Sequence, residues 1–381
     1  MNELRLTRTR PAMPSLLGDF AICPAKYLLE SESHSYKRLP LHPRVILGSI
    51  VHHLADSAQQ RKMDVDSLSV KQLENNFSAA LTTNQRIGPV TSWIHERYGI
   101  AGLVSRQTIV TQIRYARSLV SPALMGAISR YEKELPVGRE LILTSDHFDL
   151  QGRADLIYQD QPDRLKIVDF KTGKVNDEQN QPKDAYLLQI AAYGIMVKEL
   201  LPDMKIRLEI TGIGDSWAGS LDKYLVELVT NIIGNLNEIL PRDTPLLVSK
   251  LARTGSHCTN CSCRCSCPAY TEALRSHTPQ PNIDYQQIGM DIYGQLLEME
   301  GDNHLVTIKV VQPNNHIVKI FRIPSKIIPD PKKIIGRNIT LYGLKVLDNT
   351  LIGNSPLNFL VINTQDTKKS AFNFHLQLEE V

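Results

Sequence analysis

Two short apolar runs in the middle of the sequence place acidic residues and a lysine close together. The first run contains Asp155, and the second, residues 165–170, carries Asp169 and is followed by Lys171. The polar stretch between the runs predicts a turn, so we expect the two runs to form a β-hairpin. Side chains two residues apart lie on the same face of a strand. Asp169 and Lys171 should therefore project to one side, next to Asp155.

This arrangement predicts a metal site. Two carboxylates and an ammonium group on one face of a sheet would be unfavourable unless a ligand used them. Carboxylate oxygens are suitable ligands for Mg²⁺ or Mn²⁺, and the lysine could then hold or polarise a water molecule near a phosphate. An exposed hairpin with a surface ion pair is the alternative interpretation of the same residues.

The order of motifs around this hairpin resembles the PD-(D/E)XK nucleases, and in particular their RecB-like branch. The motifs are Gly-Arg-Ala-Asp at 152–155, Val-Asp-Phe-Lys-Thr-Gly at 168–173, and then Gln189 with Tyr193. The branch includes CRISPR-associated and AddB-type exonucleases. The resemblance implies an α/β fold with a restriction-endonuclease-like core and a helical insertion. It also implies a metal-dependent deoxyribonuclease, with exonuclease action more expected than endonuclease action.

The resemblance also assigns roles to individual residues. In that family one or two Mg²⁺ or Mn²⁺ ions are held by a histidine, two carboxylates and a backbone carbonyl. The corresponding positions in this sequence are His52, Asp155, Asp169 and Phe170. Lys171 is expected to position the attacking water, and Gln189 and Tyr193 are expected to orient Lys171 or the DNA strand.

Two residues near this expected site have more than one interpretation. His52 lies in a Gly-x-x-x-His element that begins at Gly48, on a predicted helix over residues 45–60. It could bind the metal, or it could hydrogen-bond Asp56 one helical turn later. Glu140, on the predicted first strand of the core, could lie near the metal or could be a surface charge.

Five of the six cysteines lie within ten residues, which favours metal ligation over a disulfide framework. Their spacing resembles the iron–sulfur motif of the RecB-like nucleases, in which a predicted N-terminal helix, here residues 14–30, supplies one more cysteine. The expected ligands of a [4Fe–4S] cluster are Cys23, Cys258, Cys261 and Cys267. Zn²⁺ would accept the same thiolates. Cys263 or Cys265 could replace one of these ligands, and Cys23 alone could be a buried apolar residue.

The last third of the sequence changes character. We expect a nuclease domain over residues 1–275, a linker over 276–285 and a β-rich domain over 286–381. Three predicted strands, a connection and two more strands follow the order of an OB-fold, which predicts a C-terminal all-β, OB-like domain. Such modules bind single-stranded nucleic acid or dock proteins. Candidate stacking residues are Tyr293, Phe321 and Tyr342. Candidate phosphate contacts are Lys319, Arg322, Lys332, Lys333 and Lys345.

The composition is ordinary for a soluble protein, with a net charge of +3 and 22% charged residues. No apolar run is long enough to span a bilayer and no signal peptide is apparent, so we expect a cytoplasmic protein without a membrane partner. Single-stranded DNA ends are the expected substrate, in repair, recombination or anti-phage defence. A helicase or another protein could bind the C-terminal domain. The alternative is a DNA-end-binding or iron–sulfur scaffold subunit of a helicase–nuclease assembly.

Overall fold

The chain divides into two compact units that interleave along the sequence. Unit 1 comprises Met1–His34, Leu47–Leu73 and Gln107–Ala252, and unit 2 comprises Ser35–Ile46, Glu74–Arg106 and Arg253–Val381. The computed structural model describes residues 4–32, 38–60, 68–84, 86–120, 136–276, 290–328, 330–348, 350–356 and 358–363. The predicted linker, residues 276–285, lies outside the described residues except for its first position.

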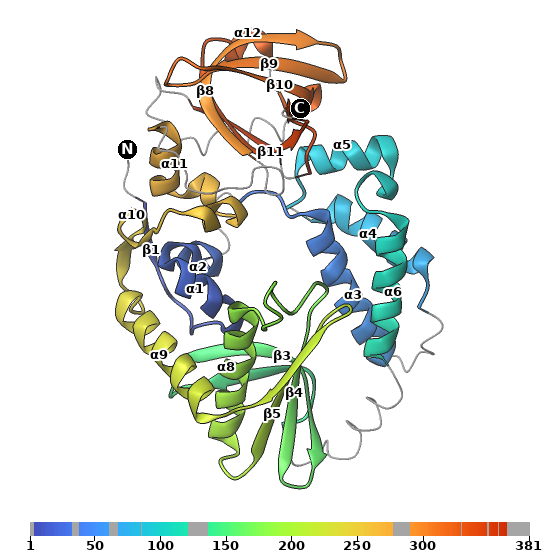
Figure 1. The fold of residues 1–381 in the computed structure, drawn as a ribbon, viewed down its shortest axis with the longest axis vertical. Coiled ribbons are helices and arrows are strands. Elements are labelled where there is room, and N and C mark those ends of the chain that lie inside the picture. The colour runs from blue at the N-terminus through green and yellow to red at the C-terminus, as the bar shows by residue number, and fades with distance from the viewer. Residues whose placement is uncertain are drawn as a thin grey trace. The chain divides into compact units, whose positions relative to one another are not determined.

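Unit 1 is built on a five-stranded sheet (Figure 1). Its strands, in spatial order, are β2 (Gly138–Ser145), β3 (Leu150–Gln161), β4 (Arg164–Phe170), β5 (Lys205–Thr211) and β6 (Ser216–Ser220). The predicted hairpin is confirmed as the antiparallel pair of β3 and β4, in which Leu156 lies opposite Val168. Asp155 and Asp169 flank that pair and are therefore neighbours across the hairpin.

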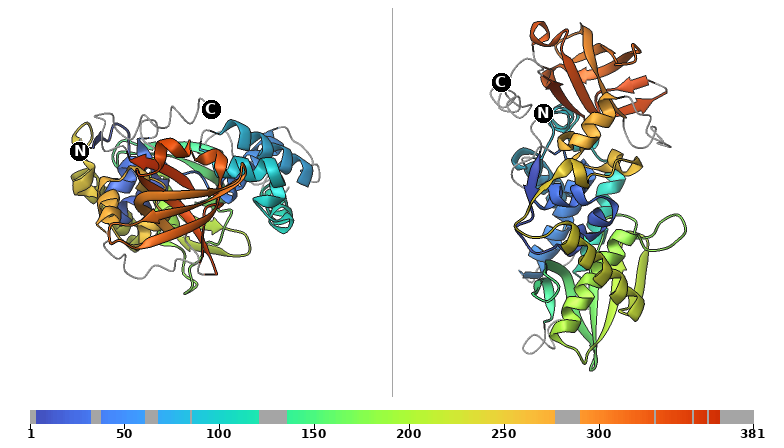
Figure 2. Two further views of the ribbon diagram at one scale, coloured as in Figure 1. Left: turned by 90° about the horizontal axis from the view of Figure 1, so that it is seen from above. Right: turned by 90° about the vertical axis from the view of Figure 1, so that its left-hand side faces the viewer.

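A single helix connects the two parallel strands β4 and β5. Parallel neighbours need a crossover, and α8 (Asp184–Leu200) supplies it and packs along the sheet (Figure 1; Figure 2). Two further helices, α1 (Leu17–Ile22) and α9 (Lys223–Ile239), contact α8 as well. This explains why α8 is buried almost continuously from Leu188 to Val197.

The N-terminal helix that the sequence predicts over residues 14–30 is interrupted. A short 3₁₀ turn (Pro14–Leu16) leads into α1, and α2 (Pro24–Ser31) begins after a break at Cys23. The backbone of Cys23 is extended, with φ −155° and ψ 109°. Proline disfavours the helical conformation of the residue before it, so Pro24 ends the first helix and begins the second.

Helix α6 (Arg106–Leu119) is fixed to the ends of two central strands. The Gln112 side chain donates a hydrogen bond to the carbonyl of Thr172 at 3.2 Å, and the Tyr115 hydroxyl donates to the carbonyl of Thr211 at 2.8 Å. The remaining elements that lie wholly or partly in unit 1 are α3 (Pro43–Gln60), α4 (Val70–Thr83), β1 (Arg5–Thr7), β7 (Pro245–Leu247) and α10 (Val248–Leu251). In the part of the chain that is described, no helix is long and apolar enough to cross a membrane.

Unit 2 contains a closed five-stranded barrel (Figure 1). Its strands are β8 (Met290–Gly301), β9 (Leu305–Val311), β10 (Ile317–Pro324), β11 (Asn338–Leu347) and β12 (Thr350–Ile352). Each strand pairs with the next in the order β8, β9, β10, β12, β11 and back to β8, and the pairing of β10 with β12 is parallel. A short 3₁₀ turn (Ser325–Ile327) and α12 (Pro331–Ile334) connect β10 to β11.

The closing strand of the barrel differs from the prediction. Two strands were expected after the connection, and β11 is the first of them. The last described strand, β13 (Phe359–Asn363), does not close the barrel and only adds to the outer edge of β11. The strand that closes the barrel is β12, which has three residues. Such a short strand has too little alternation to be recognised from sequence.

A helix from far earlier in the chain completes the barrel core. Val90, Trp93 and Ile94 of α5 (Pro89–Tyr98) are buried in one cluster with barrel residues such as Leu296. A 3₁₀ turn (Ile100–Gly102) follows α5. The barrel is therefore not formed by the last hundred residues alone.

The cysteine-rich segment is fixed to the barrel by a buried ion pair. The segment comprises two 3₁₀ turns (Ser256–Asn260 and Arg264–Ser266) and α11 (Pro268–Arg275). The Arg264 guanidinium contacts both carboxylate oxygens of Asp291 at 2.6 and 3.1 Å. The Tyr270 hydroxyl and the Gly343 amide also donate to Asp291, each at 2.8 Å. Removing either partner would leave the other charge buried and unpaired, which is costly.

Candidate active site

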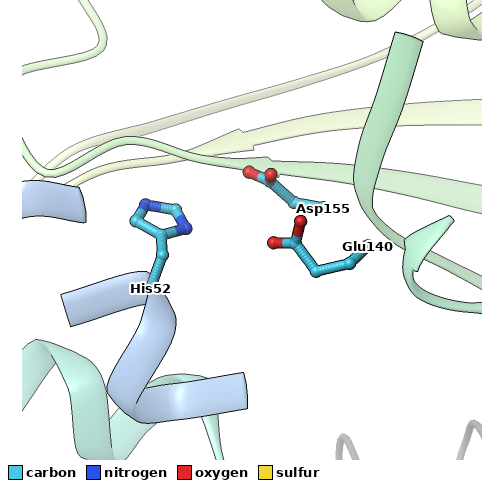
Figure 3. Close-up of side chains that lie close together, drawn as sticks. All are labelled: His52, Glu140 and Asp155. Carbon is cyan, nitrogen blue, oxygen red and sulfur yellow. The ribbon is translucent and has the colours of Figure 1, made fainter. Parts of the chain in front are cut away.

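Three side chains from different elements converge beside the hairpin in unit 1. The possible ligand atoms of His52, Glu140 and Asp155 all lie within 4.8 Å of one another. Figure 3 shows His52 on its helix facing the two carboxylates. Within the described residues, this is the group of histidine, cysteine and acidic side chains whose geometry could hold a metal ion.

The position of His52 depends on a close approach of α3 to the loop after β4. A Cβ atom at Gly48 would lie 2.5 Å from the Thr172 hydroxyl oxygen, so only glycine fits there. Burial lowers the pKa of His52, against the opposing effects of the Asp155 and Asp56 carboxylates. A lowered pKa favours the neutral imidazole, which is the form that binds metals.

Glu140 reaches the site through an unusual backbone conformation. Its φ is 51°, in the left-handed region that residues other than glycine rarely adopt. The preceding residue, Arg139, donates to Asp56 of α3 at 3.0 Å, while Glu140 itself lies beside His52 of the same helix. Neighbouring residues of a regular strand would point to opposite faces. The left-handed residue thus directs two successive side chains toward α3, and strain of this kind is typical of functional sites.

The surroundings of Glu140 favour its protonated form. Burial raises its pKa to about 7, and the negative charges of Asp56 and Asp155 add to the effect. The opposing influence is Arg153, whose Nε lies 2.6 Å from a Glu140 oxygen. A divalent cation at this position would remove the repulsion between the carboxylates, and an imidazole with two carboxylates is a suitable donor set, more so for Mn²⁺ than for Mg²⁺.

Lys171, Asp169 and Gln189 form a closed network next to this group. The Lys171 ammonium lies 2.7 Å from one Asp169 oxygen and donates to the Gln189 carbonyl at 2.8 Å. The Gln189 amide donates to the other Asp169 oxygen at 2.9 Å. Burial raises the pKa of Asp169 to about 7, against the lowering effect of Lys171. The ammonium also lies 4.7 Å from the centre of the Tyr186 ring, a cation–π contact.

Tyr193 holds the strand that carries Asp155. Its hydroxyl donates to the carbonyl of Arg153 at 2.9 Å. A Cβ atom at Gly152 would lie 2.9 Å from the Tyr193 ring, which explains the glycine in the Gly-Arg-Ala-Asp motif. One oxygen of Asp155 accepts from the Phe170 amide at 2.7 Å, so the carboxylate is fixed to the neighbouring strand.

The structure thus brings most of the expected residues together. The three side chains that converge most closely, however, are not the expected three. His52 and Asp155 lie side by side, whereas Asp169 is engaged by Lys171 and Gln189. The third member of the converging group is Glu140. Glu140 belongs to this group because of its position on β2. The pairs Arg139–Leu156 and Leu141–Ala154 place it opposite Asp155 of β3. That register could not be assigned before the strand pairing was known.

The candidate cluster ligands belong to both units. Cys23 is buried in unit 1, where it precedes α2, and the other cysteines lie in unit 2. Burial raises the pKa of Cys265 to about 12. The remaining four thiols of the segment are buried on its short turns: Cys258, Cys261, Cys263 and Cys267. Several buried thiols on short turns are a suitable donor set for iron or zinc.

The chain is similar to one known protein family and to several solved structures. A family model described as the PD-(D/E)XK nuclease superfamily matches residues 13–268. No curated protein matches the sequence. One similar solved structure is that of a candidate exonuclease from Eubacterium rectale, at 14% identity and a TM-score of 0.32, covering 58% of this chain and 76% of that one. Another is SSO0001, at 13% identity and a TM-score of 0.24, covering 53% of this chain and 95% of that one.

Proposed function

Because the chain belongs to the PD-(D/E)XK nuclease superfamily, we propose that it is a RecB-like deoxyribonuclease that hydrolyses phosphodiester bonds with a bound Mg²⁺ or Mn²⁺ ion. The observation that carries this proposal is the convergence of His52, Glu140 and Asp155 beside the Lys171 network. The alternative interpretation, an exposed hairpin with a surface ion pair, does not account for the approach of these groups from three separate elements. The activity is assigned to residues 1–275.

The metal would be held by the converging group. His52, Glu140 and Asp155 supply one imidazole and two carboxylates, and Asp169 and the Phe170 carbonyl remain candidates for further ligands. When bound, the ion would lower the pKa of a water molecule and neutralise charge on the scissile phosphate. Neutral His52 is ready to bind, since burial already disfavours its charged form.

Lys171 would act on the water or on the phosphate. An ammonium group has three protons to donate, and Asp169 and Gln189 engage two of them. The third can be directed to a phosphate oxygen, where it would stabilise the negative charge that develops in the transition state. In this account Gln189 and Tyr193 are positioning residues, because they hold Lys171 and the Asp155 strand respectively.

Arg153 is a further candidate for phosphate binding. Its side chain is 67% exposed, and its described charged partner is Glu140. If Glu140 binds a metal ion instead of Arg153, the Arg153 side chain becomes available to a phosphate of the incoming DNA strand. Arginine suits this role because its planar donors match phosphate oxygens.

The substrate that we propose is single-stranded DNA with a free end. The barrel of unit 2 is closed, and its order of three strands, a helical connection and two further strands supports an OB-like module. Such a module would suit a nuclease that acts on single strands in repair, recombination or anti-phage defence. A helicase could supply those strands and bind the same unit.

We also propose a [4Fe–4S] cluster ligated by Cys23, Cys258, Cys261 and Cys267, with Zn²⁺ as the alternative. Such a cluster would link segments that are far apart in the sequence, and its role would be structural. Metal analysis of protein purified without oxygen tests this. About four irons and four sulfides per chain are expected, with a loss of both in Cys258→Ser. A stoichiometric zinc content without iron would contradict the iron–sulfur assignment.

The activity is tested by comparing linear and circular single-stranded DNA. End-labelled linear DNA and a circle of the same sequence are incubated with the full chain and Mn²⁺ or Mg²⁺, with EDTA as the control. Degradation of the linear strand alone supports an end-dependent exonuclease, and cutting of both identifies an endonuclease. If a folded, cluster-containing protein cuts neither, the nuclease proposal fails and a DNA-end-binding or scaffold role takes its place.

A further inference from the structure

The outer face of the barrel carries two adjoining hollows that the nuclease proposal does not use. They measure about 340 and 280 Å³, and both are lined by Phe321 of β10 and Thr307 of β9. The larger hollow extends to the turn between β11 and β12, where Leu347 and Thr350 line it. The smaller one extends toward the end of β8. Together they form a groove across β9 and β10, hereafter called the barrel groove.

A β-bulge gives β10 its unusual outer face. The register with β9 shifts between Ile320 and Ile323, and Arg322 between them has a φ of 54°. In a regular strand one of two successive residues faces the core. Here Ile320 and Ile323 are buried, whereas Phe321 and Arg322 are both exposed. The bulge therefore presents an aromatic ring and a guanidinium side by side, and bulges often redirect side chains at functional sites.

Phe321 is the aromatic residue of the barrel that is available to a ligand. It is 38% exposed and lines both hollows, so its ring can be reached from either of them. The two tyrosines that the sequence offered as further stacking residues, Tyr293 and Tyr342, are 8% and 2% exposed. They belong to the interior of unit 2 and cannot stack on a base.

Charges along the barrel groove are balanced. Lys309 is paired with Glu298, while no ion pair among the described residues involves Lys319 or Arg322. The acidic lining residues Glu298, Glu300 and Asp348 offset the basic ones. This pattern does not suit a ligand held mainly by its charge. It suits one that places a flat apolar surface on Phe321 and makes a small number of anionic contacts.

We propose that the barrel groove binds single-stranded nucleic acid, with one base stacked on Phe321 and neighbouring phosphates on Lys319 and Arg322. A nucleotide strand offers that combination of flat faces and spaced negative charges, and stacking on aromatic side chains is tolerant of sequence. In barrels with this strand order, the second and third strands and the loop between the last two form the usual ligand face. The barrel groove lies on β9, β10 and the β11–β12 turn, which are those positions.

Binding in the absence of metal tests this proposal separately from the nuclease activity. Fluorescently labelled oligothymidylate and oligouridylate are titrated with the full chain in EDTA, and anisotropy gives the dissociation constant. Phe321→Ala should weaken binding at least about fivefold, the lower end of what stacking on an aromatic ring contributes, and Phe321→Tyr should restore it. Lys319→Gln and Arg322→Gln should each reduce the salt dependence of log K by about 0.7.

Ile317→Ala is the matched control. Ile317 is an exposed apolar residue of the same strand, and it lies outside both hollows. Its removal should leave the dissociation constant unchanged. A Phe321→Ala protein that binds as tightly as the wild type, or a wild type that binds neither oligonucleotide in EDTA, would overturn the proposal. Because no metal is present, a loss of DNA cleavage alone would not.

Discussion

Among single residues, Glu140 most directly distinguishes the candidate metal site from the one expected from sequence. Glu140→Gln keeps the size of the side chain but removes its charge. We predict that Mn²⁺ binding weakens at least about tenfold, because affinity for hard cations depends on the number of charged ligands. Isothermal titration calorimetry with Mn²⁺ measures this. The matched control is Asp160→Asn. This variant removes another carboxylate of β3, which is paired with Arg164 of β4.

An unchanged Mn²⁺ affinity in Glu140→Gln would mean that Glu140 only balances the charge of Arg153. The site would then consist of His52, Asp155 and Asp169, as the sequence suggested. Reduced affinity in both Glu140→Gln and the control variant would point instead to a general effect of lost negative charge. Comparing Glu140→Gln with Asp160→Asn therefore distinguishes loss of a metal ligand from a general effect of charge.

The raised pKa values of Glu140 and Asp169 predict a pH dependence of stability. Both lie at about 7 in the folded protein, above the unfolded values of about 4. Between these values the folded protein retains protons that the unfolded chain has released. The free energy of unfolding of the metal-free protein should therefore fall as the pH rises from about 4 to about 7.

Denaturant unfolding in EDTA at several pH values measures this slope. Asp169→Asn should make it shallower, because the variant has no proton to release there and only the contribution of Glu140 remains. Addition of Mn²⁺ should restore stability at neutral pH, since the ion replaces the protons. A slope that is the same in the wild type and in Asp169→Asn would show that the Asp169 carboxyl does not titrate in this range.

Among the elements, α3 packs closely against the loop after β4. Gly48→Ala should destabilise the protein by about 1–3 kcal/mol, the usual cost of overpacking, because the added Cβ would lie 2.5 Å from the Thr172 hydroxyl. It should also displace His52 and weaken Mn²⁺ binding. Thermal unfolding and calorimetry measure the two effects. Combining the change with Thr172→Ala, which removes the clashing atoms, should recover part of the loss.

A second helical glycine provides the control. Gly234 in α9 has nothing within 4 Å of the position that a Cβ would take. Gly234→Ala should therefore stabilise the protein by about 0.5–1 kcal/mol through helix propensity alone. If Gly48→Ala were equally stabilising, the close packing of α3 against the loop after β4 would be wrong.

The elements also show which parts of the fold could be predicted. The β3–β4 hairpin and α8 were predictable because their apolar patterns are long and regular. The break at Cys23 could have been inferred from Pro24, whose local effect on the chain is known. The closing strand β12 could not, because three residues carry no pattern and their pairing is set by strands distant in sequence.

At the scale of the whole molecule, the barrel core depends on a helix from the first third of the chain. Trp93 of α5 is 6% exposed and belongs to that core. Trp93→Ala should cost about 3–5 kcal/mol of stability, and a fragment of residues 286–381 should fold poorly because it lacks α5. Denaturant unfolding of the variant and circular dichroism of the fragment test this. A stable, cooperatively folded fragment would contradict it.

Contacts between distant parts of the chain limit what can be predicted from the sequence. The sequence could propose Asp155, Asp169, Lys171 and His52 as candidate site residues, because their motifs are local and their chemistry is distinctive. The interleaving of the two units was not, since contacts between residues 89–98 and the barrel leave no local pattern. The place of Glu140 likewise depends on strand register and on one left-handed residue.

We propose that Lys171 acts on the water or the phosphate at a site that holds a metal ion. One comparison of two proteins tests this most directly. Wild type and Lys171→Ala, purified without oxygen, are brought to equal Mn²⁺ occupancy and mixed with end-labelled linear single-stranded DNA. We predict that both bind Mn²⁺ with similar affinity and that only the wild type cleaves the strand. Cleavage by Lys171→Ala at a rate near that of the wild type would contradict the account.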